Sequence, residues 1–162
     1  MLRPDFLRGI SCLEDFDLAY DILIYNKRLP VAAEFVKQFP RQRFVLDHLA
    51  KPPIKAGLID DWAEGIRRIS DFPNVYCKLS GLVTEADWGT WTTKQIHPYI
   101  KVAVEAFGLE RLMIGSDWPV CLVASSYRRV MALVQDYFKG YSSEQRELLF
   151  GGNAQRFWNL KA

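Results

Sequence analysis

A regular alternation of short apolar runs with longer amphipathic segments is the feature that most constrains how this chain can fold. Four runs of about 5 to 7 residues lack strict polar alternation, which is typical of strands buried on both faces of a parallel sheet. These runs are 19–25, 43–47, 75–79 and 112–116. Their spacings of about 24, 32 and 37 residues suit βαβ units with right-handed crossovers. We therefore predict an α/β fold in which successive strands lie side by side.

Each gap between the runs has the pattern of a helix. Apolar residues recur at helical spacing, and Pro40, Pro73 and Gly108 stand where three of these helices would end. A capping-box pattern, Ser142-x-x-Gln145, opens a further helical segment that we expect to break at 151–152. The other expected helices are 5–16, 29–39, 60–72, 94–107, 125–137 and 153–158. We treat residues 1–162 as one domain of about four βα units, which form either half of a (β/α)8 TIM barrel or a small open α/β sheet.

Composition and charge exclude several classes of protein. With 49% apolar and 25% charged residues, the 162-residue chain can build one core. The formal charge is only +2 and the basic residues are dispersed, so no nucleic-acid partner is expected. No stretch approaches the roughly 20 apolar residues that cross a bilayer, and the first residues lack an export pattern, so we expect a cytoplasmic protein without a membrane partner. Cys12, Cys77 and Cys121 form no Cys-x-x-Cys pair and are expected to be reduced core thiols.

Chemistry is expected where the strands end, because ligands of parallel α/β folds bind at the carboxyl ends of the strands. His48 follows the second run, Lys78 lies near the end of the third, and Asp117 follows the fourth. Such groups can polarise a carbonyl and deprotonate water. Each also has a structural interpretation: Asp117 could cap the next turn, and a histidine at a strand end is more often a hydrogen-bonded structural residue than a ligand.

Four residues, Lys78 among them, are candidate substrate contacts. Lys51 could reach a substrate carboxylate or simply be solvated, while Lys78 in an apolar strand needs a partner such as Asp47 or Asp117 because a buried unpaired ammonium is costly. Trp88 lies in a long polar connection that could form a lid over a sugar-like ring, although packing against the barrel rim is an equal alternative. The remaining candidate is Trp118, beside Asp117. We expect His97, before a proline at a helix start, to be a surface residue.

Four segments of the chain resemble motifs of the amidohydrolase-related (amidohydrolase 2) family. Their order and spacing agree with that family over essentially the whole chain. The segments are Asp47-His48-Leu49-Ala50-Lys51-Pro52, Lys78-Leu79-Ser80-Gly81-Leu82, the run 112–120 (LMIGSDWPV) and the run 150–158 (FGGNAQRFW).

The resemblance implies a TIM barrel that hydrolyses a cyclic ester or a related bond, as do the family's lactonases of sugar acids. It implies that Asp117 activates the attacking water and that His48 contacts the substrate or a metal. Some members of the family use a divalent metal such as zinc, for which His48 and Asp117 would be ligands, and others work without one. The resemblance therefore leaves the cofactor open.

This sequence also departs from the family pattern. Members are nearly twice as long and begin with a strand that ends in a His-x-His pair, whereas this sequence has two histidines that form no such pair. We therefore predict the C-terminal half of a barrel, holding the fifth to eighth strands. The expected function is lactone hydrolysis, impaired in this chain alone. The alternative is a non-catalytic half barrel that dimerises through its open edges as a binding module.

Overall fold

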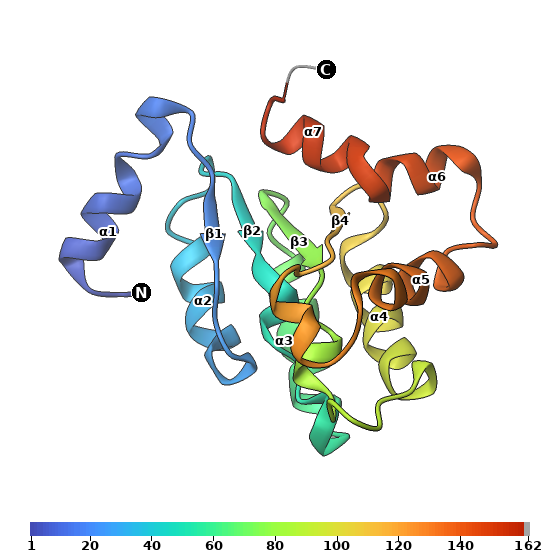
Figure 1. Ribbon diagram of the computed structural model, residues 1–162. Helices are drawn as coiled ribbons and strands as arrows, with labels where there is room; N and C mark the ends of the chain where they lie inside the picture. Colours follow the sequence, from blue (N-terminus) through green and yellow to red (C-terminus); the bar gives the residue numbers. More distant parts are fainter. Residues whose placement is uncertain (161–162) are drawn as a thin grey trace.

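A computed structural model describes residues 1–160 and shows one parallel four-stranded sheet in the order β1-β2-β3-β4 (Figure 1). Its strands are β1 (Tyr20–Ile22), β2 (Phe44–Leu46), β3 (Val75–Leu79) and β4 (Leu112–Ile114). The prediction of neighbouring strands in chain order is confirmed. Three strands are shorter than predicted, because the ladder pairs only Tyr20–Ile22 with Phe44–Leu46 and only Leu112–Ile114 with the end of β3.

Helices occur in every gap, as predicted. They are α1 (Pro4–Ser11), α2 (Leu29–Val36), α3 (Asp60–Ser70), α4 (Thr93–Phe107), α5 (Tyr127–Tyr137), α6 (Ser143–Glu147) and α7 (Asn153–Phe157). The single helix expected at 5–16 is wrong, because α1 ends at Ser11 and a separate 3-10 turn spans Glu14–Phe16.

The break expected at 151–152 is also wrong. The capping box of Ser142 and Gln145 is present at the start of α6, and a π-helical turn, Leu148–Gly152, then joins α6 directly to α7. The side-chain amide of Asn153 donates to the backbone carbonyls of Leu109 (2.6 Å) and Leu112 (2.7 Å), which fastens this helical segment to β4.

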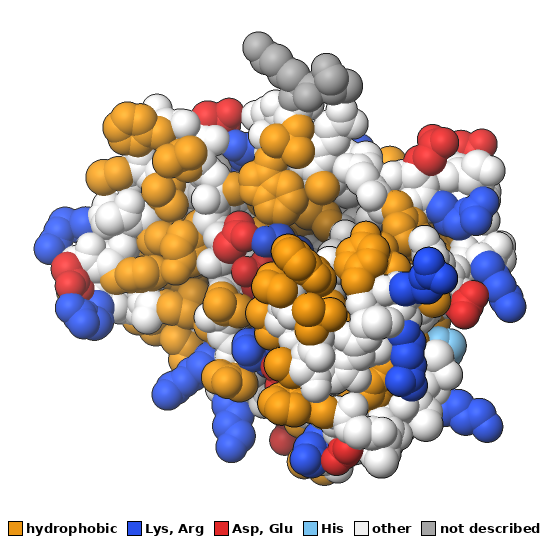
Figure 2. All heavy atoms as spheres, in the orientation of Figure 1, with side chains coloured by type: hydrophobic (Ala, Val, Ile, Leu, Met, Phe, Trp, Pro, Cys, Tyr) orange, Lys and Arg blue, Asp and Glu red, His pale blue; other side chains and the backbone are white. Residues whose placement is uncertain are grey.

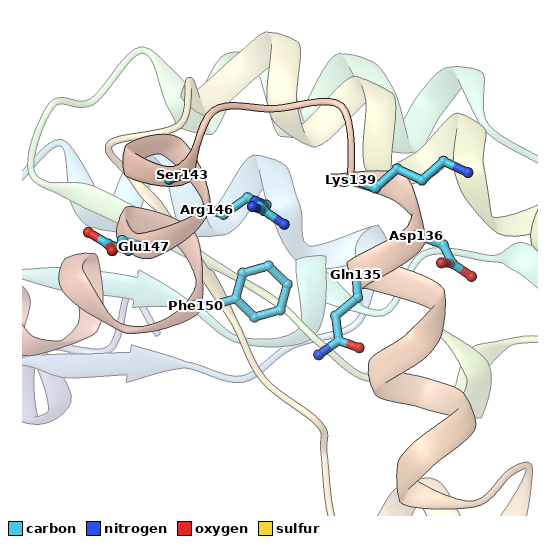
Figure 3. Close-up of a pocket in the computed structure, with 7 residues that line it drawn as sticks. All are labelled: Gln135, Asp136, Lys139, Ser143, Arg146, Glu147 and Phe150. Carbon is cyan, nitrogen blue, oxygen red and sulfur yellow. The ribbon is translucent and has the colours of Figure 1, made fainter.

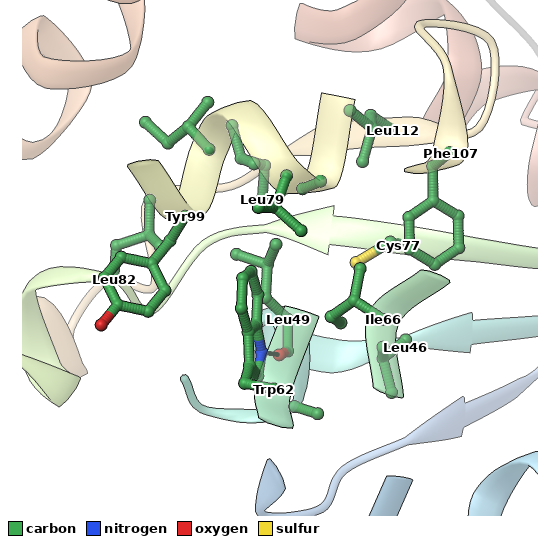
Figure 4. Close-up of a cluster of buried hydrophobic side chains, with 14 of the residues drawn as sticks. Leu46, Leu49, Trp62, Ile66, Cys77, Leu79, Leu82, Tyr99, Phe107 and Leu112 are labelled. Atoms are coloured by element: carbon green, nitrogen blue, oxygen red, sulfur yellow. Dashed lines mark hydrogen bonds between the residues drawn. The ribbon is translucent and has the colours of Figure 1, made fainter. Parts of the chain in front are cut away.

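The main core lies between the sheet and helices α2, α3 and α4 (Figure 1). In β3, alternate residues Val75, Cys77 and Leu79 are fully buried on this side, while Tyr76 and Lys78 point to the other face. Figure 4 shows Cys77 and Leu79 of β3 among side chains from α3 and α4. One layer of helices on one face is the arrangement of a barrel wall, whose opposite face becomes the barrel interior.

The opposite face of the sheet is covered only in part. Val45 and Met113 pack there against Phe157 of α7, and the Tyr76 ring contacts the Phe157 ring at a tilt of 51°, with ring centroids 4.8 Å apart. Within residues 1–160, β1 pairs only with β2 and β4 only with β3, so each outer strand has one edge without a strand partner. The described chain thus forms a wall with an open inner face.

The thiols agree only in part with the sequence-based expectation. Cys77 and Cys121 are buried, as predicted, but Cys12 is exposed, because only Ile10 of α1 is buried and the end of that helix faces outward. None of the helices within residues 1–160 combines the length and apolar character needed to cross a membrane.

Burial of Cys77 makes the stability of the chain sensitive to alkaline pH. Burial raises the pKa of this thiol far above its ordinary value of 9.0. A raised folded-state pKa gives stability that is complete below the unfolded-state pKa and is lost as pH rises above it. We expect the Cys77 contribution to the free energy of unfolding to fall by about 1 kcal/mol between pH 9 and pH 10.

Urea unfolding between pH 7.5 and pH 10 measures this effect. Cys77→Ala should lose less stability across that range than the unchanged chain, and Cys12→Ala, which removes an exposed thiol, should lose as much. Equal pH slopes for the unchanged chain and Cys77→Ala would contradict the prediction.

Candidate functional site at the carboxyl ends of the strands

The chain leaves β2 through a left-handed turn that positions His48. Residues His48, Leu49, Ala50 and Lys51 have φ of 48°, 51°, 55° and 52°, and the Lys51 N–H donates to the His48 carbonyl (2.8 Å). Each non-glycine residue in this conformation costs about 1–2 kcal/mol. Such strain persists where the surrounding structure enforces it, and it is concentrated at functional sites.

Two long-range hydrogen bonds and two buried side chains enforce this turn. Leu49 and Ala50 are fully buried, the Trp62 indole donates to the Leu49 carbonyl (2.8 Å), and the Asn26 amide donates to the Lys51 carbonyl (3.0 Å). The loop after β1 and helix α3 thereby fix the direction in which the His48 side chain leaves the backbone.

The imidazole of His48 faces the carboxylate of Asp117. His48 Nε2 lies 3.7 Å from Asp117 Oδ1, and the two side chains are 24% and 11% exposed. Asp117 follows β4 with φ of 57°, directly before a cis Trp118–Pro119 bond, and its carbonyl accepts from the Cys121 N–H (2.8 Å). The gap between the two groups is too long for a direct hydrogen bond and leaves them facing a shared space at the strand ends.

Two residues after β3 hold the other side of the His48 ring. The Ser80 hydroxyl lies 2.8 Å from His48 Nδ1, and Ser80 is 5% exposed. Gly81 has φ of 66°, and a Cβ there would lie 2.9 Å from both Cβ and Cγ of His48, so only glycine leaves room for the ring. The sequence analysis predicted no role for Ser80 or Gly81, although both lie in the 78–82 segment that resembles a family motif.

Lys78 shares its ammonium between two carboxylates on the inner face of the sheet. Its Nζ lies 2.5 Å from Asp21 Oδ2 and 2.7 Å from Asp47 Oδ1. Burial alone would lower the pKa of Lys78, but the hydrogen bonds to Asp21 and Asp47 outweigh burial and raise it. The expected partner Asp47 is thus present, Asp117 is not a partner, and Asp21 was missed because β1 lies two strands away.

A hollow of about 690 Å³ opens beside Lys51. Its walls come from the loops after β1, β2 and β3, and it includes Tyr25, Lys51, Glu85 and Trp88. Lys51 Nζ lies 3.6 Å from Glu85 Oε1 and 5.0 Å from the centre of the Tyr25 ring. Trp88 is 57% exposed, and its indole donates to the Thr84 carbonyl. Exposed aromatic faces beside paired charges suit a small polar ring.

The segment after β4 carries an exposed apolar patch. Figure 2 shows apolar side chains gathered over this segment on the face that is drawn. The exposed large side chains there are Trp118, Val120, Leu122, Val123 and Tyr127. Trp118, which the sequence suggested as a substrate contact, therefore lies exposed at the outer rim and is not packed in the core.

Two other features lie apart from this site. A hollow of about 580 Å³ between α5 and α6 is lined by Gln135, Asp136, Lys139, Ser143, Arg146, Glu147 and Phe150 (Figure 3), none of which is at a strand end. His97 is half-buried against the Tyr137 ring, with centroids 5.0 Å apart, so the expectation of a surface residue is wrong. His97 lies in the first turns of α4, on the side of that helix that faces Tyr137 of α5.

His48 and Asp117 fit part of a metal site. Two ligands of one zinc ion, each about 2.0–2.2 Å from the metal, can span their 3.7 Å separation. A catalytic zinc uses three protein ligands. Within residues 1–160, no group of three or more His, Cys, Asp and Glu side chains is arranged to hold a metal ion. Within the described residues, His48 and Asp117 thus offer two side chains that one metal ion could bind, one fewer than a catalytic zinc requires.

Comparison with known proteins decides the family. The family model described as Amidohydrolase matches residues 2–160. The chain belongs to the amidohydrolase family. This amidohydrolase chain is 40% identical to an L-fucono-1,5-lactonase of Burkholderia multivorans over 166 residues, covering 96% of the chain. It is 26% identical to an L-rhamnono-gamma-lactonase of Scheffersomyces stipitis, covering 97% of the chain.

The fold of a solved relative agrees closely. An amidohydrolase from Burkholderia multivorans with bound zinc superposes with a TM-score of 0.94 at 39% identity. The match covers 98% of this amidohydrolase chain and 58% of that one, and it confirms the prediction of half a barrel. The chain likewise spans 56% and 54% of the lengths of the two lactonases.

Proposed function

We propose that this chain supplies the His48 and Asp117 side of the active site of a lactonase that hydrolyses a cyclic ester of a sugar acid. The observation that carries the proposal is the 3.7 Å approach of His48 Nε2 to Asp117 Oδ1, at the strand ends where barrel enzymes bind substrate. The relatives named L-fucono-1,5-lactonase and L-rhamnono-gamma-lactonase support the substrate class.

We propose complementary roles for the two side chains. The Asp117 carboxylate accepts a proton from a water molecule as the water oxygen attacks the lactone carbonyl carbon. The His48 imidazole donates a hydrogen bond to the carbonyl oxygen and stabilises the negative charge that develops there. The ring C–O bond then breaks, and the departing ring oxygen takes up the proton, which gives the open hydroxy acid.

The neighbouring hollow is proposed to hold the rest of the sugar ring. Trp88 and Tyr25 offer aromatic faces, and Lys51 and Glu85 offer a donor and an acceptor for hydroxyl groups. Trp118 would border the substrate at the rim. An ammonium has three N–H donors; Lys78 donates to Asp21 and forms an ion pair with Asp47, and we propose that a remaining N–H donates to a substrate oxygen.

As an alternative to the hydrogen bond from His48 Nε2, a divalent metal such as zinc is proposed as cofactor, with His48 Nε2 and Asp117 Oδ1 among its ligands; the ion would then replace the Nε2–H as the group that polarises the carbonyl. The zinc bound by the solved relative supports this choice. When bound, such an ion would polarise the carbonyl and lower the pKa of a bound water. We further propose a cytoplasmic protein that acts on a small molecule, which suits its three free thiols.

A chimera tests the proposed function. Residues 1–160 of this chain would replace the matching part of the Burkholderia multivorans lactonase, to which the chain is 40% identical. We expect the chimera to hydrolyse L-fucono-1,5-lactone or a related sugar lactone, as measured by acid release. A folded chimera that is inactive on a panel of sugar-acid lactones would contradict the proposal.

A second candidate is a non-catalytic half barrel that dimerises as a binding module. The unpaired edges of β1 and β4 and the exposed patch at Trp118–Val123 favour self-association. A discrete dimer of the 162-residue chain, together with an inactive chimera, would support this candidate over the enzyme.

A further inference from the structure

Ser80 makes one contact that bears directly on the chemistry of the site. Its side chain follows β3, lies at 5% exposure, and approaches His48 Nδ1 at 2.8 Å. Among the described residues, His48 Nδ1 is the hydrogen-bond partner of the Ser80 hydroxyl. A buried hydroxyl without an acceptor is costly, so its proton is best satisfied by the lone pair of Nδ1.

The other ring nitrogen of His48, Nε2, also favours a proton on Nε2 and a lone pair on Nδ1. Nε2 faces the Asp117 carboxylate at 3.7 Å, and an ionised carboxylate can only accept hydrogen bonds. A proton on Nε2 is therefore favoured over a lone pair. Because the tautomer of an imidazole is set by the hydrogen bond that its other nitrogen makes, the two contacts select one and the same tautomer.

The backbone around Ser80 leaves the ring and the hydroxyl little room to move. A Cβ at Gly81 would lie 2.9 Å from the ring atom Cγ of His48, and a Cβ at Gly115 would lie 3.3 Å from the Ser80 Cβ. The ends of β3 and β4 thus enclose the Ser80–His48 pair, and the left-handed turn holds the His48 backbone.

We infer that Ser80 is a positioning residue, whose hydroxyl donates to His48 Nδ1 and thereby directs the Nε2–H of His48 into the space that it shares with Asp117. The inference deepens the proposed lactonase and rests on it for the role of His48. In that role the Nε2–H is the donor to the lactone carbonyl oxygen, and Ser80 keeps this donor available. A serine hydroxyl can also rotate to accept, so the same residue supports the opposite tautomer that a metal on Nε2 requires.

Nitrogen NMR of the metal-free 162-residue chain tests the hydrogen bond without any turnover. The sequence has only two histidines, and His97→Gln identifies the signals of His48. At about pH 9, above the ordinary pKa of imidazole, we expect widely separated shifts for a protonated Nε2 and an unprotonated Nδ1. Ser80→Ala should remove at least half of this separation, because the tautomer is then no longer locked, and Ser80→Thr should restore it.

The matched control is Ser70→Ala. Ser70 is a buried serine of α3 whose hydroxyl donates to the Arg67 carbonyl, and its loss should leave the His48 signals unchanged. A His48 protonated on Nδ1 in the unchanged chain, or an unaltered separation in Ser80→Ala, would overturn the inference.

The chimera supplies the kinetic measurement. Loss of a partner that orients a catalytic histidine costs about 10–100-fold in activity, so Ser80→Ala should lower kcat by that factor, with little change in KM. Ser80→Thr should recover most of the rate, and Ser70→Ala should retain it. If the chimera is inactive but the tautomer responds to Ser80→Ala, the lactonase proposal fails and the hydrogen bond stands. If the chimera is active and Ser80→Ala leaves kcat unchanged, the positioning role is wrong.

Discussion

Asp117→Asn is expected to lower the kcat of the chimera on sugar lactones by about 10²–10⁴-fold, the usual contribution of a general base. Asparagine keeps the shape of the side chain but cannot take a proton from water. The Asp117 side chain is 11% exposed and faces His48. Bulk water therefore has little access to this position and cannot take over the role of the base. KM should change little, because the loss is confined to the transition state.

Asp136→Asn provides the matched control for this substitution. Asp136 is an exposed aspartate of α5, away from the strand ends, and its replacement should leave kcat unchanged. Circular dichroism and thermal unfolding would establish that both variants are folded. An Asp117→Asn chimera with the parental rate would remove Asp117 from the chemistry.

The 162-residue chain by itself is expected to hydrolyse the same lactones at least about 100-fold more slowly than the chimera, because it lacks catalytic groups that each contribute about 10²–10⁴-fold. Residues 1–160 contain no group of three side chains arranged to hold a metal ion, and each outer strand of their sheet has an edge without a strand partner. A substrate there would be exposed to water, which weakens the electrostatic interactions that stabilise its transition state.

Parallel assays of chain and chimera at equal concentration measure this deficit, with zinc added to both. Light scattering on the same samples gives the oligomeric state, which shows whether a second copy has closed the open face. Turnover of the isolated chain equal to that of the chimera would contradict the expectation.

The parts of the site that the sequence predicted are those set by a general rule. Parallel strands bring their carboxyl ends to one edge, so His48 after β2 and Asp117 after β4 could be expected there before any coordinates. Strand order followed in the same way from the spacing of the apolar runs. The ends of several strands and helices, the single helix at 5–16 and the break at 151–152 were not predicted correctly.

The parts that were missed depend on contacts between distant segments. The left-handed turn at His48–Lys51 contains no glycine or asparagine, so nothing local indicates it, and the enforcing hydrogen bonds come from Asn26 and Trp62. The contact of Ser80 with His48 exists only because that turn aims the ring toward β3. Asp21 meets Lys78 across the intervening strand β2, a distance that sequence spacing does not reveal.

The cluster of Asp21, Lys78 and Asp47 restricts what can lie against the inner face. Two carboxylates and one ammonium sum to a formal charge of −1, and Asp21 is still 40% exposed. An entirely apolar surface packed against this face would desolvate a cluster that still carries a net negative charge, at a cost of several kcal/mol. Any polypeptide that completes the barrel must therefore bring a cationic or hydrogen-bond-donating group to this level, or leave a trapped solvent molecule there.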